Sequence, residues 1–331
     1  MKRLLSILLC ALLLALPLGL YASSAETVQR LWPTTQFVTG EKPWWIMPRL
    51  LRLQYIPKSA TQGGFRQDSL LILHEGRLVH EEYGSGYDMD TPHAAWSVTK
   101  SVVSALVGIA VGEGLIEGPE QKVRDFYPEA VIAPGQESKL DMTVAHLLQM
   151  RSGLPDSSEC FRADDAGLAA FETPQERDPG GRFAYNSGAG PQCVVGILQR
   201  ATGQNLFDYA QEKLFGPLGM DSVAWERTED GSPRGGYGIY MTPRDMLRFG
   251  YLYLNDGVWD EQRILPEGWV AQTRDMQRAW VIFSYGFFFW DDGNSLLLGP
   301  SYEARGLIGQ FVTIYPEKGV VVVRTSGGFR G

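Results

Sequence analysis

The sequence predicts an α+β protein with one antiparallel sheet, built from strands near the N- and C-terminal ends of the chain, flanked by helices and interrupted by a mostly helical insertion. Two observations carry this prediction. Apolar, β-branched runs bounded by turn residues occur near residues 70–80 and again at 311–324, whereas helix start and stop signals dominate residues 118–279. Strands at both ends with helices between them must pair across the insertion to form one sheet.

Composition excludes several classes of protein. The chain has 331 residues, of which 44% are hydrophobic and 21% charged, with a formal net charge of −8. This is typical of a soluble globular protein, and the acidic balance without a basic run argues against a nucleic-acid partner. The sequence contains 4 histidines, and His74 and His80 do not have the spacing of a zinc site. No phosphate-binding loop is present, so we expect neither a metal nor a cofactor.

Residues 1–25 have the pattern of a secretory signal peptide. Lys2 and Arg3 precede an apolar run that extends to Leu20 and is followed by small residues. We therefore expect a periplasmic or secreted protein with no stable membrane insertion after cleavage. The alternative is an uncleaved N-terminal helix that anchors the protein.

Beyond this segment, we expect an irregular arm at 26–65 and a main domain at 66–331. The arm is rich in tryptophan and proline and has no clear periodicity. Within the main domain, the sheet part comprises 66–117 and 280–331, and the helical part comprises 118–279. Predicted strands cover 70–73, 77–80, 280–283, 287–290, 311–315 and 320–324, with hairpin turns at Glu75-Gly76 and 316–319.

Helix boundaries in the insertion follow from capping residues. Thr143 can cap a helix over 144–150, and Asn205 can cap one that stops at Gly216-Pro217. Pro191 can start a helix that Gly203 closes after residue 201. Thr242-Pro243 opens an amphipathic helix over 246–254.

The run from Val98 to Val111 predicts a helix that is buried on all sides, with Ser97 and Lys100 at its start. Residues three apart share a helix face, so the Lys100 amine is expected beside the Ser97 hydroxyl. Burial lowers the pKa of a lysine, which suits it to accept a proton from a nucleophilic serine. The alternative is an N-cap serine with a first-turn surface lysine.

Tyr185 is the candidate for the third group, which would protonate a leaving group. It precedes Ser187 in a glycine-rich loop just before the helix predicted to start at Pro191. A tyrosine whose pKa is lowered by the lysine could serve as acid and base. A purely structural tyrosine is the alternative for this position, and Tyr83 and Tyr253 carry the same weak pattern.

Cys160 and Cys193 flank this second motif on either side. If the protein is exported, disulfides persist in its compartment, so we predict that the two cysteines pair. Two buried free thiols are the alternative.

These motifs together resemble the serine beta-lactamase and penicillin-binding protein superfamily. The resemblance rests on Ser97-x-x-Lys100, Tyr185-x-Ser187 and the stretch 306–310. Three further segments, at 147–154, 217–220 and 242–246, also resemble the family. Within the superfamily these stretches are similar to the class C-related branch, with its 6-aminohexanoate-dimer hydrolase-like and esterase-like members. The similarity covers about residues 66–326 and implies the beta-lactamase/transpeptidase-like fold.

The resemblance also implies a role for each matching residue. Ser97 would be the acylated nucleophile, Lys100 its activating amine and Tyr185 the acid/base, with the backbone N–H groups of Ser97 and Gln310 forming the oxyanion hole. Residues implied to contact substrate are Ser187, Arg305, Leu307, Ile308 and Gly309. The sequence departs from the family at Ser187, where Asn is common, and at Leu307, where Lys or His usually stands. The family's last helix is not found either, so we expect the arm at 26–65 to cover that face of the sheet.

The resulting prediction is an exported serine hydrolase that acts through an acyl-enzyme on a small amide or ester. A beta-lactamase or D-alanyl-D-alanine carboxypeptidase is the first alternative. A catalytically silent penicillin-binding sensor of the same fold is the alternative from another class. No Gly-x-Ser-x-Gly occurs, so an α/β-hydrolase nucleophile elbow is not expected.

Overall fold

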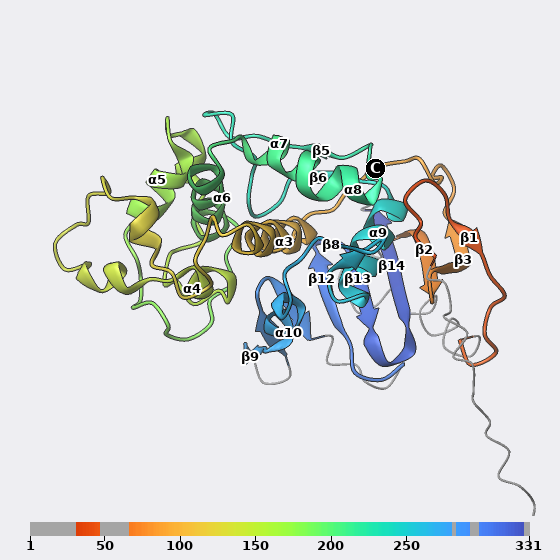
Figure 1. Ribbon diagram of the computed structural model, residues 1–331. Helices are drawn as coiled ribbons and strands as arrows, with labels where there is room; N and C mark the ends of the chain where they lie inside the picture. The colour runs from red at the N-terminus through yellow and green to blue at the C-terminus, as the bar shows by residue number, and fades with distance from the viewer. Residues whose placement is uncertain (1–30, 47–65, 280–282, 292–297, 328–331) are drawn as a thin grey trace, which may run out of the picture. The chain divides into compact units, whose positions relative to one another are not determined.

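A nine-stranded sheet runs through the described part of the chain in the order β1-β3-β2-β14-β13-β12-β11-β10-β9 (Figure 1). This computed structural model describes residues 31–46, 66–279, 283–291 and 298–327. All neighbouring strands are antiparallel except β1 and β3. The strands of this sheet are β1 (Val38–Thr39), β2 (Arg66–His74), β3 (Arg77–Tyr83), β9 (Gln277–Arg278), β10 (Ser284–Gly286), β11 (Phe289–Asp291), β12 (Tyr302–Gly306), β13 (Gln310–Tyr315) and β14 (Val320–Gly327).

The two predicted hairpins form, and their pairing confirms the sheet expected from both ends of the chain. β2 and β3 join through Glu75 and Gly76, which have φ of 48° and 79°. Such left-handed conformations suit glycine and the tight turn of a hairpin. β13 and β14 join through the short 3-10 turn Pro316–Lys318. β2 and β14 then pair directly, with Ile72 opposite Val322.

The last predicted pair of strands differs from the structure. Residues 280–282 lie outside the described residues, so the expected strand at 280–283 is not described. The expected strand at 287–290 is wrong in its first half, because Phe287 and Phe288 form the turn between β10 and β11 with φ of 40° and 65°. Two aromatic residues carry no turn signal, and this turn is fixed by the burial of both rings instead.

The described α-helices all lie between β3 and β9 in the sequence, and Figure 1 shows α4, α5 and α6 grouped apart from β2 and β14. Capping boxes at Thr143 and Thr242 and a left-handed Gly203 set three of the expected ends. The described α-helices are α3 (Val98–Gly112), α4 (Val144–Leu148), α5 (Ala166–Glu172), α6 (Ala189–Thr202), α7 (Leu206–Ala210), α8 (Gly216–Leu218), α9 (Pro243–Leu254) and α10 (Trp269–Arg274). Shorter elements are the 3-10 turns Val123–Phe126, Glu137–Asp141 and Glu159–Arg162, and the strands β4 (His93–Ala94), β5 (Ala224–Trp225), β6 (Ile239–Met241), β7 (Val258–Trp259) and β8 (Gln262–Arg263).

The helix capped by Asn205 continues past its predicted stop. A π-helical turn, Gln211–Phe215, follows α7 and leads into α8, which ends at the left-handed Gly219. Pro217 stands in the first turn of α8, where its missing N–H breaks no helical hydrogen bond. The proline therefore starts a short helix here instead of ending one.

Each face of the sheet is buried by a different layer. Alternate residues of β14 face opposite sides: Val321 and Val323 belong to the main core with α3 and α9, whereas Val320 and Val322 belong to a second cluster. Gly250 allows α9 to lie close to the sheet, because a Cβ there would come within 2.6 Å of a Val321 methyl group. The apolar run of β14 is thus explained by burial on both faces.

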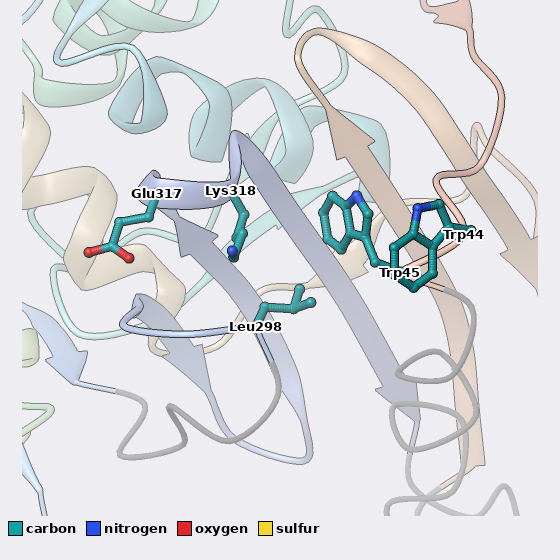
Figure 2. A pocket seen from close by; sticks show the side chains of 5 residues that line it. All are labelled: Trp44, Trp45, Leu298, Glu317 and Lys318. Atoms are coloured by element: carbon teal, nitrogen blue, oxygen red, sulfur yellow. The ribbon is translucent and has the colours of Figure 1, made fainter. Parts of the chain in front are cut away.

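Part of the arm covers the second face, as expected. Ile46 and Trp45 pack against this cluster together with Leu298, and Figure 2 shows Trp44 and Trp45 beside a hollow that Leu298 and Lys318 also line. Residues 1–25, the expected signal peptide, and residues 26–30 and 47–65 of the arm lie outside the described residues. No helix in the described ranges is both long enough and apolar enough to span a bilayer.

The prediction of a disulfide between Cys160 and Cys193 is wrong. Cys160 and Cys193 are both free and buried. The two residues belong to different elements: Cys160 lies in a 3-10 turn with its thiol directed at the Ser157 carbonyl at 4.0 Å, while Cys193 lies in α6 beside Tyr127. Burial raises the pKa of both thiols, that of Cys160 to about 11. Each cysteine therefore behaves as a small apolar core residue.

We expect unreduced protein, once denatured, to take up one alkyl group at Cys160 and one at Cys193. Alkylation of the native protein should be much slower, because burial and a raised pKa both suppress the reactive thiolate. Peptide mass spectrometry of samples alkylated before and after denaturation measures this, with a pre-reduced sample as control. A linked peptide pair containing both cysteines in the unreduced sample would contradict the structure.

Candidate active site

Helix α3 places Ser97 and Lys100 on one face at its start, as the spacing predicts. Ser97 occupies the N-cap position, and every residue from Val98 to Ala110 is buried. Trp96, just before the serine, has a φ of 49°, a left-handed conformation that is uncommon for an aromatic residue. The chain therefore turns sharply before Ser97 and then enters a helix enclosed by protein.

Three oxygen atoms surround the Lys100 amine. Its Nζ lies 2.9 Å from Ser97 Oγ, 3.0 Å from Ser187 Oγ and 2.8 Å from the Gly236 carbonyl oxygen. Lys100 is only 1% exposed. The expectation that the amine lies within hydrogen-bond reach of the serine is confirmed.

Burial lowers the pKa of Lys100 to about 7, and the negative charge of Asp156 opposes part of this shift. A neutral amine has two N–H groups and one lone pair. The Gly236 carbonyl can only accept a hydrogen bond, and the Ser187 hydroxyl can accept the second. The lone pair is then available to the Ser97 hydroxyl, which is the arrangement that a general base requires.

Tyr185 lies on the other side of the serine. Its hydroxyl interacts with the Ser97 side chain, and its ring lies 4.8 Å from Lys100 Nζ. The rings of Trp290, Tyr285 and Phe183 surround it, with centroids 5.5 Å, 6.1 Å and 6.4 Å away. The structure therefore brings Ser97, Lys100 and Tyr185 together.

The expected lowering of the Tyr185 pKa is wrong. Burial raises the pKa of this hydroxyl to about 12, despite the contact with Ser97 and the charge of Arg305, which both lower it. Lys100 lies over the face of the ring, and with a pKa of about 7 it carries little positive charge above neutral pH. Tyr185 is thus a protonated hydrogen-bond donor at neutral pH, which makes Lys100 the better candidate for the base.

The other candidate tyrosines are held elsewhere. Tyr253 is 1% exposed and packs on Phe289, with the two ring centroids 4.7 Å apart. Tyr83 donates a hydrogen bond to Glu81 at 2.6 Å. Neither of them is a contact of the Lys100 amine.

A second loop, which no pattern in the sequence indicates, holds the Tyr185 motif in place. The Asp156 carboxylate accepts hydrogen bonds from the N–H groups of Ser187 and Gly188 at 2.7 Å and 3.0 Å. The Asn186 amide donates to the carbonyls of Leu154 and Pro155. These bonds fix the backbone on either side of Ser187, so its hydroxyl points at the lysine.

Glycine is required where backbones meet at this site. A Cβ at Gly236 would lie 1.9 Å from the Ser187 carbonyl oxygen, and one at Gly188 would lie 1.9 Å from that of Ser157. A side chain at either position would push the loops apart. Gly236, whose carbonyl accepts from Lys100, was missed by sequence reasoning because a backbone acceptor leaves no side-chain pattern.

The third motif forms the turn between β12 and β13. Gly306 pairs with Gln310, and Ile308 and Gly309 have φ of 63° and 92°. A Cβ at Gly306 would meet the Ala95 carbonyl oxygen at 2.4 Å, so this strand end lies against the segment that leads to Ser97. Leu307 is 61% exposed and presents a hydrocarbon at the position where the resemblance leads one to expect Lys or His.

Two arginines lie near this turn, but neither of them is a free cation that could supply the positive charge missing at Leu307. Arg305 is paired with the buried Glu303, with Nε 2.6 Å from the carboxylate, and packs over Trp290 at 5.5 Å. Arg324, which the sequence analysis did not single out, lies behind Gly309, and burial lowers its pKa. Within the described residues, no group of three or more His, Cys, Asp or Glu side chains could hold a metal ion.

Comparisons with known proteins agree with this geometry. A family model described as Beta-lactamase matches residues 53–330. The 6-aminohexanoate-dimer hydrolase of Paenarthrobacter ureafaciens is 26% identical over 292 residues, covering 78% of this chain and 72% of the relative. Penicillin-binding protein 4 of Amycolatopsis lactamdurans is 26% identical over 322 residues, covering 84% and 83%.

Solved structures show the same fold. The crystal structure of a family VIII carboxylesterase superposes with a TM-score of 0.70 at 17% identity, covering 88% of this chain and 94% of that one. An α+β fold with a large sheet flanked by helices, a match over most of the chain and the Ser97, Lys100 and Tyr185 cluster all agree. The chain belongs to the Beta-lactamase family, in the beta-lactamase/transpeptidase-like group of proteins.

Proposed function

We propose that the protein is an exported serine hydrolase that cleaves a small amide or ester through an acyl-enzyme. The observation that supports this most directly is the Lys100 amine, buried at hydrogen-bond distance from Ser97 Oγ with a pKa near 7. A lysine buried for structure alone would gain nothing from a serine whose hydroxyl faces a partly exposed site. Relatives named as an amide hydrolase and a carboxylesterase support the same reaction class.

In the acylation step that we infer, Lys100 takes the proton of Ser97 as Oγ attacks the substrate carbonyl carbon. The carbonyl electrons move to the oxygen, and in this proposal the N–H groups of Ser97 and Gln310 stabilise the resulting negative charge. When the carbon to leaving-group bond breaks, Tyr185 gives the leaving group a proton and regains one from the Lys100 ammonium. The products are an ester on Ser97, a neutral alcohol or amine, and a neutral lysine.

Deacylation reverses the roles. Lys100 takes a proton from a water molecule, whose oxygen attacks the acyl carbon, and Ser97 leaves with that proton. Export is part of the proposal because of the pattern at residues 1–25. A penicillin-processing activity is the second candidate, favoured by the relative named as a penicillin-binding protein.

A fluorophosphonate probe should label the wild-type protein, and Ser97→Ala should abolish labelling. The reason is that Ser97 combines partial exposure with a buried base and, unlike Ser187, which also contacts that base, stands at the N-cap of α3. Ser85→Ala, at an exposed turn, is the matched control and should label like wild type. Undiminished labelling of Ser97→Ala would mean that another residue is the nucleophile.

The acid limb of kcat/KM should lie near pH 7, with activity rising as pH increases and Lys100 loses its proton. Asp156→Asn keeps an oxygen acceptor for the Ser187 N–H but removes the negative charge that raises the Lys100 pKa. The acid limb of this variant should therefore move to lower pH. A limb that stays in place, or moves upward, in a folded Asp156→Asn variant would remove Lys100 from the role of base.

Uncharged short-chain esters should be better substrates than penicillin-like compounds. Leu307 cannot make the charge-assisted hydrogen bond to a carboxylate beside the scissile bond, and such a bond is typically worth about 1.5–3 kcal/mol. Measuring kcat/KM for p-nitrophenyl butyrate and for nitrocefin on one preparation checks this. Faster turnover of nitrocefin, unaffected by Arg305→Ala, would show that the carboxylate is bound by another route.

A further inference from the structure

A cavity of about 320 Å³ with three arginines in its wall adjoins the reaction centre. Arg162, Arg227 and Arg234 line it together with Tyr237 and Ser158. Ser158 follows Asp156, which fixes the Ser187 backbone, by two residues. Tyr237 directly follows Gly236, whose carbonyl holds the Lys100 amine. Both walls of the cavity are therefore continuous with residues of the candidate active site.

A second, smaller cavity reaches the residue that precedes Ser97. It has a volume of about 200 Å³ and is lined by Trp96, which precedes Ser97, and by Tyr240 and Glu226. Tyr237 lines this cavity as well as the larger one. A substrate chain that leaves Ser97 along Trp96 would thus pass Tyr237 and end among the arginines.

The larger cavity carries excess positive charge in a protein whose formal net charge is −8. Arg162 and Arg227 are exposed, and neither makes an ion pair within the described ranges. Arg234 is paired with Glu226 at 2.7 Å, and its guanidinium lies 5.4 Å from the Tyr237 ring centroid. Glu229 is the one carboxylate in the lining of the larger cavity. Within the lining, Arg162 and Arg227 thus stand against one carboxylate, that of Glu229. The Asp230 carboxylate next to Thr228 accepts hydrogen bonds from Thr228, Ala166 and Ser232.

Because the positive charge is carried by guanidinium groups, the cavity is suited to bind a carboxylate. Arginine stays protonated at all relevant pH values and binds the planar carboxylate through two parallel hydrogen bonds. Ser158 lines the same cavity and adds a hydroxyl donor, whereas the Thr228 hydroxyl is already directed at Asp230 and the Ser232 carbonyl. The Arg234 guanidinium is held in place by the Phe161 and Tyr237 rings on which it packs, so little side-chain entropy is lost when it binds.

We propose that this cavity is a subsite for a carboxylate at the far end of the substrate, remote from the bond that is cleaved. The inference rests on the proposed hydrolase function and narrows its substrate class to esters or amides of chains that end in a carboxylate. A penicillin cannot use the subsite, because its carboxylate lies next to the scissile bond, on the side of Leu307. Short acyl chains that end in a carboxylate cannot use the subsite either, because their carboxylate ends before it reaches Tyr237.

The test compares p-nitrophenyl monoesters of glutaric, adipic and suberic acid with twins in which the free carboxylate is a methyl ester. Wild-type kcat/KM should favour the acid over its twin for the longer chains, and the preference should shrink as salt is added. Arg227→Ala and Arg162→Ala should each reduce this preference by about three- to tenfold, and the double variant should abolish it. The methyl-ester twins should be hydrolysed by these variants as by wild type.

Arg124→Ala is the matched control, because Arg124 is exposed and lies in a 3-10 turn away from both cavities. It should keep the preference for the acids. If wild type hydrolyses acids and twins equally at every chain length, or if the double variant keeps the preference, the subsite does not exist although the hydrolase function stands. If no ester is turned over, the hydrolase function has failed, and the subsite is measured as tighter binding of suberate monoamide than of its methyl ester to Ser97→Ala. Equal binding of that pair would overturn the subsite as well.

Discussion

The structure of the candidate active site depends on one buried amine. Lys100 is almost fully enclosed, and the free-energy cost of burying an ammonium group favours its neutral form. A neutral amine still needs partners for its two N–H groups, and the Gly236 carbonyl and the Ser187 hydroxyl provide them. These partners come from separate parts of the helical region, so the lysine can be satisfied only when the loops around it are assembled on α3.

This requirement explains why backbone contacts at the site are so close. Gly236 touches the Ser187 backbone, Gly188 touches Ser157, and Gly306 touches Ala95, each at a separation that leaves no room for a Cβ. A side chain at any of these positions would displace a loop whose polar atoms contact the lysine or support its partners. The charge of Asp156 acts in the same place in two ways, since it holds the Ser187 backbone and raises the pKa of Lys100. Geometry and protonation are therefore set by the same contacts.

Features that depend on neighbouring residues could be predicted from the sequence, whereas features that depend on burial could not. The start of α3, the hairpin at Glu75-Gly76 and the capping box at Thr242 are local, and they form as expected. The raised pKa of Tyr185 comes from aromatic rings far along the chain, and the free thiol of Cys193 depends on how α6 packs. The Gly236 carbonyl has no side chain to mark it. The positions of Ser97, Lys100 and Tyr185 could be predicted because the three residues carry a pattern. The lowered pKa of Lys100 could be predicted too, whereas the raised pKa of Tyr185 could not.

Charged side chains are placed unevenly around Ser97. At the third motif, Leu307 is apolar, and the positive charge of Arg305 is balanced by the buried Glu303. On the side of Tyr237, by contrast, Arg162 and Arg227 lie exposed without an ionic partner in the described residues. Coulomb attraction falls with distance and is screened by solvent, so a carboxylate is attracted where the unpaired cations are, and only if the substrate chain is long enough to reach them. On the proposed function, the fold keeps Ser97 and Lys100 in place, while charge on the surrounding loops sets which end of a substrate is recognised.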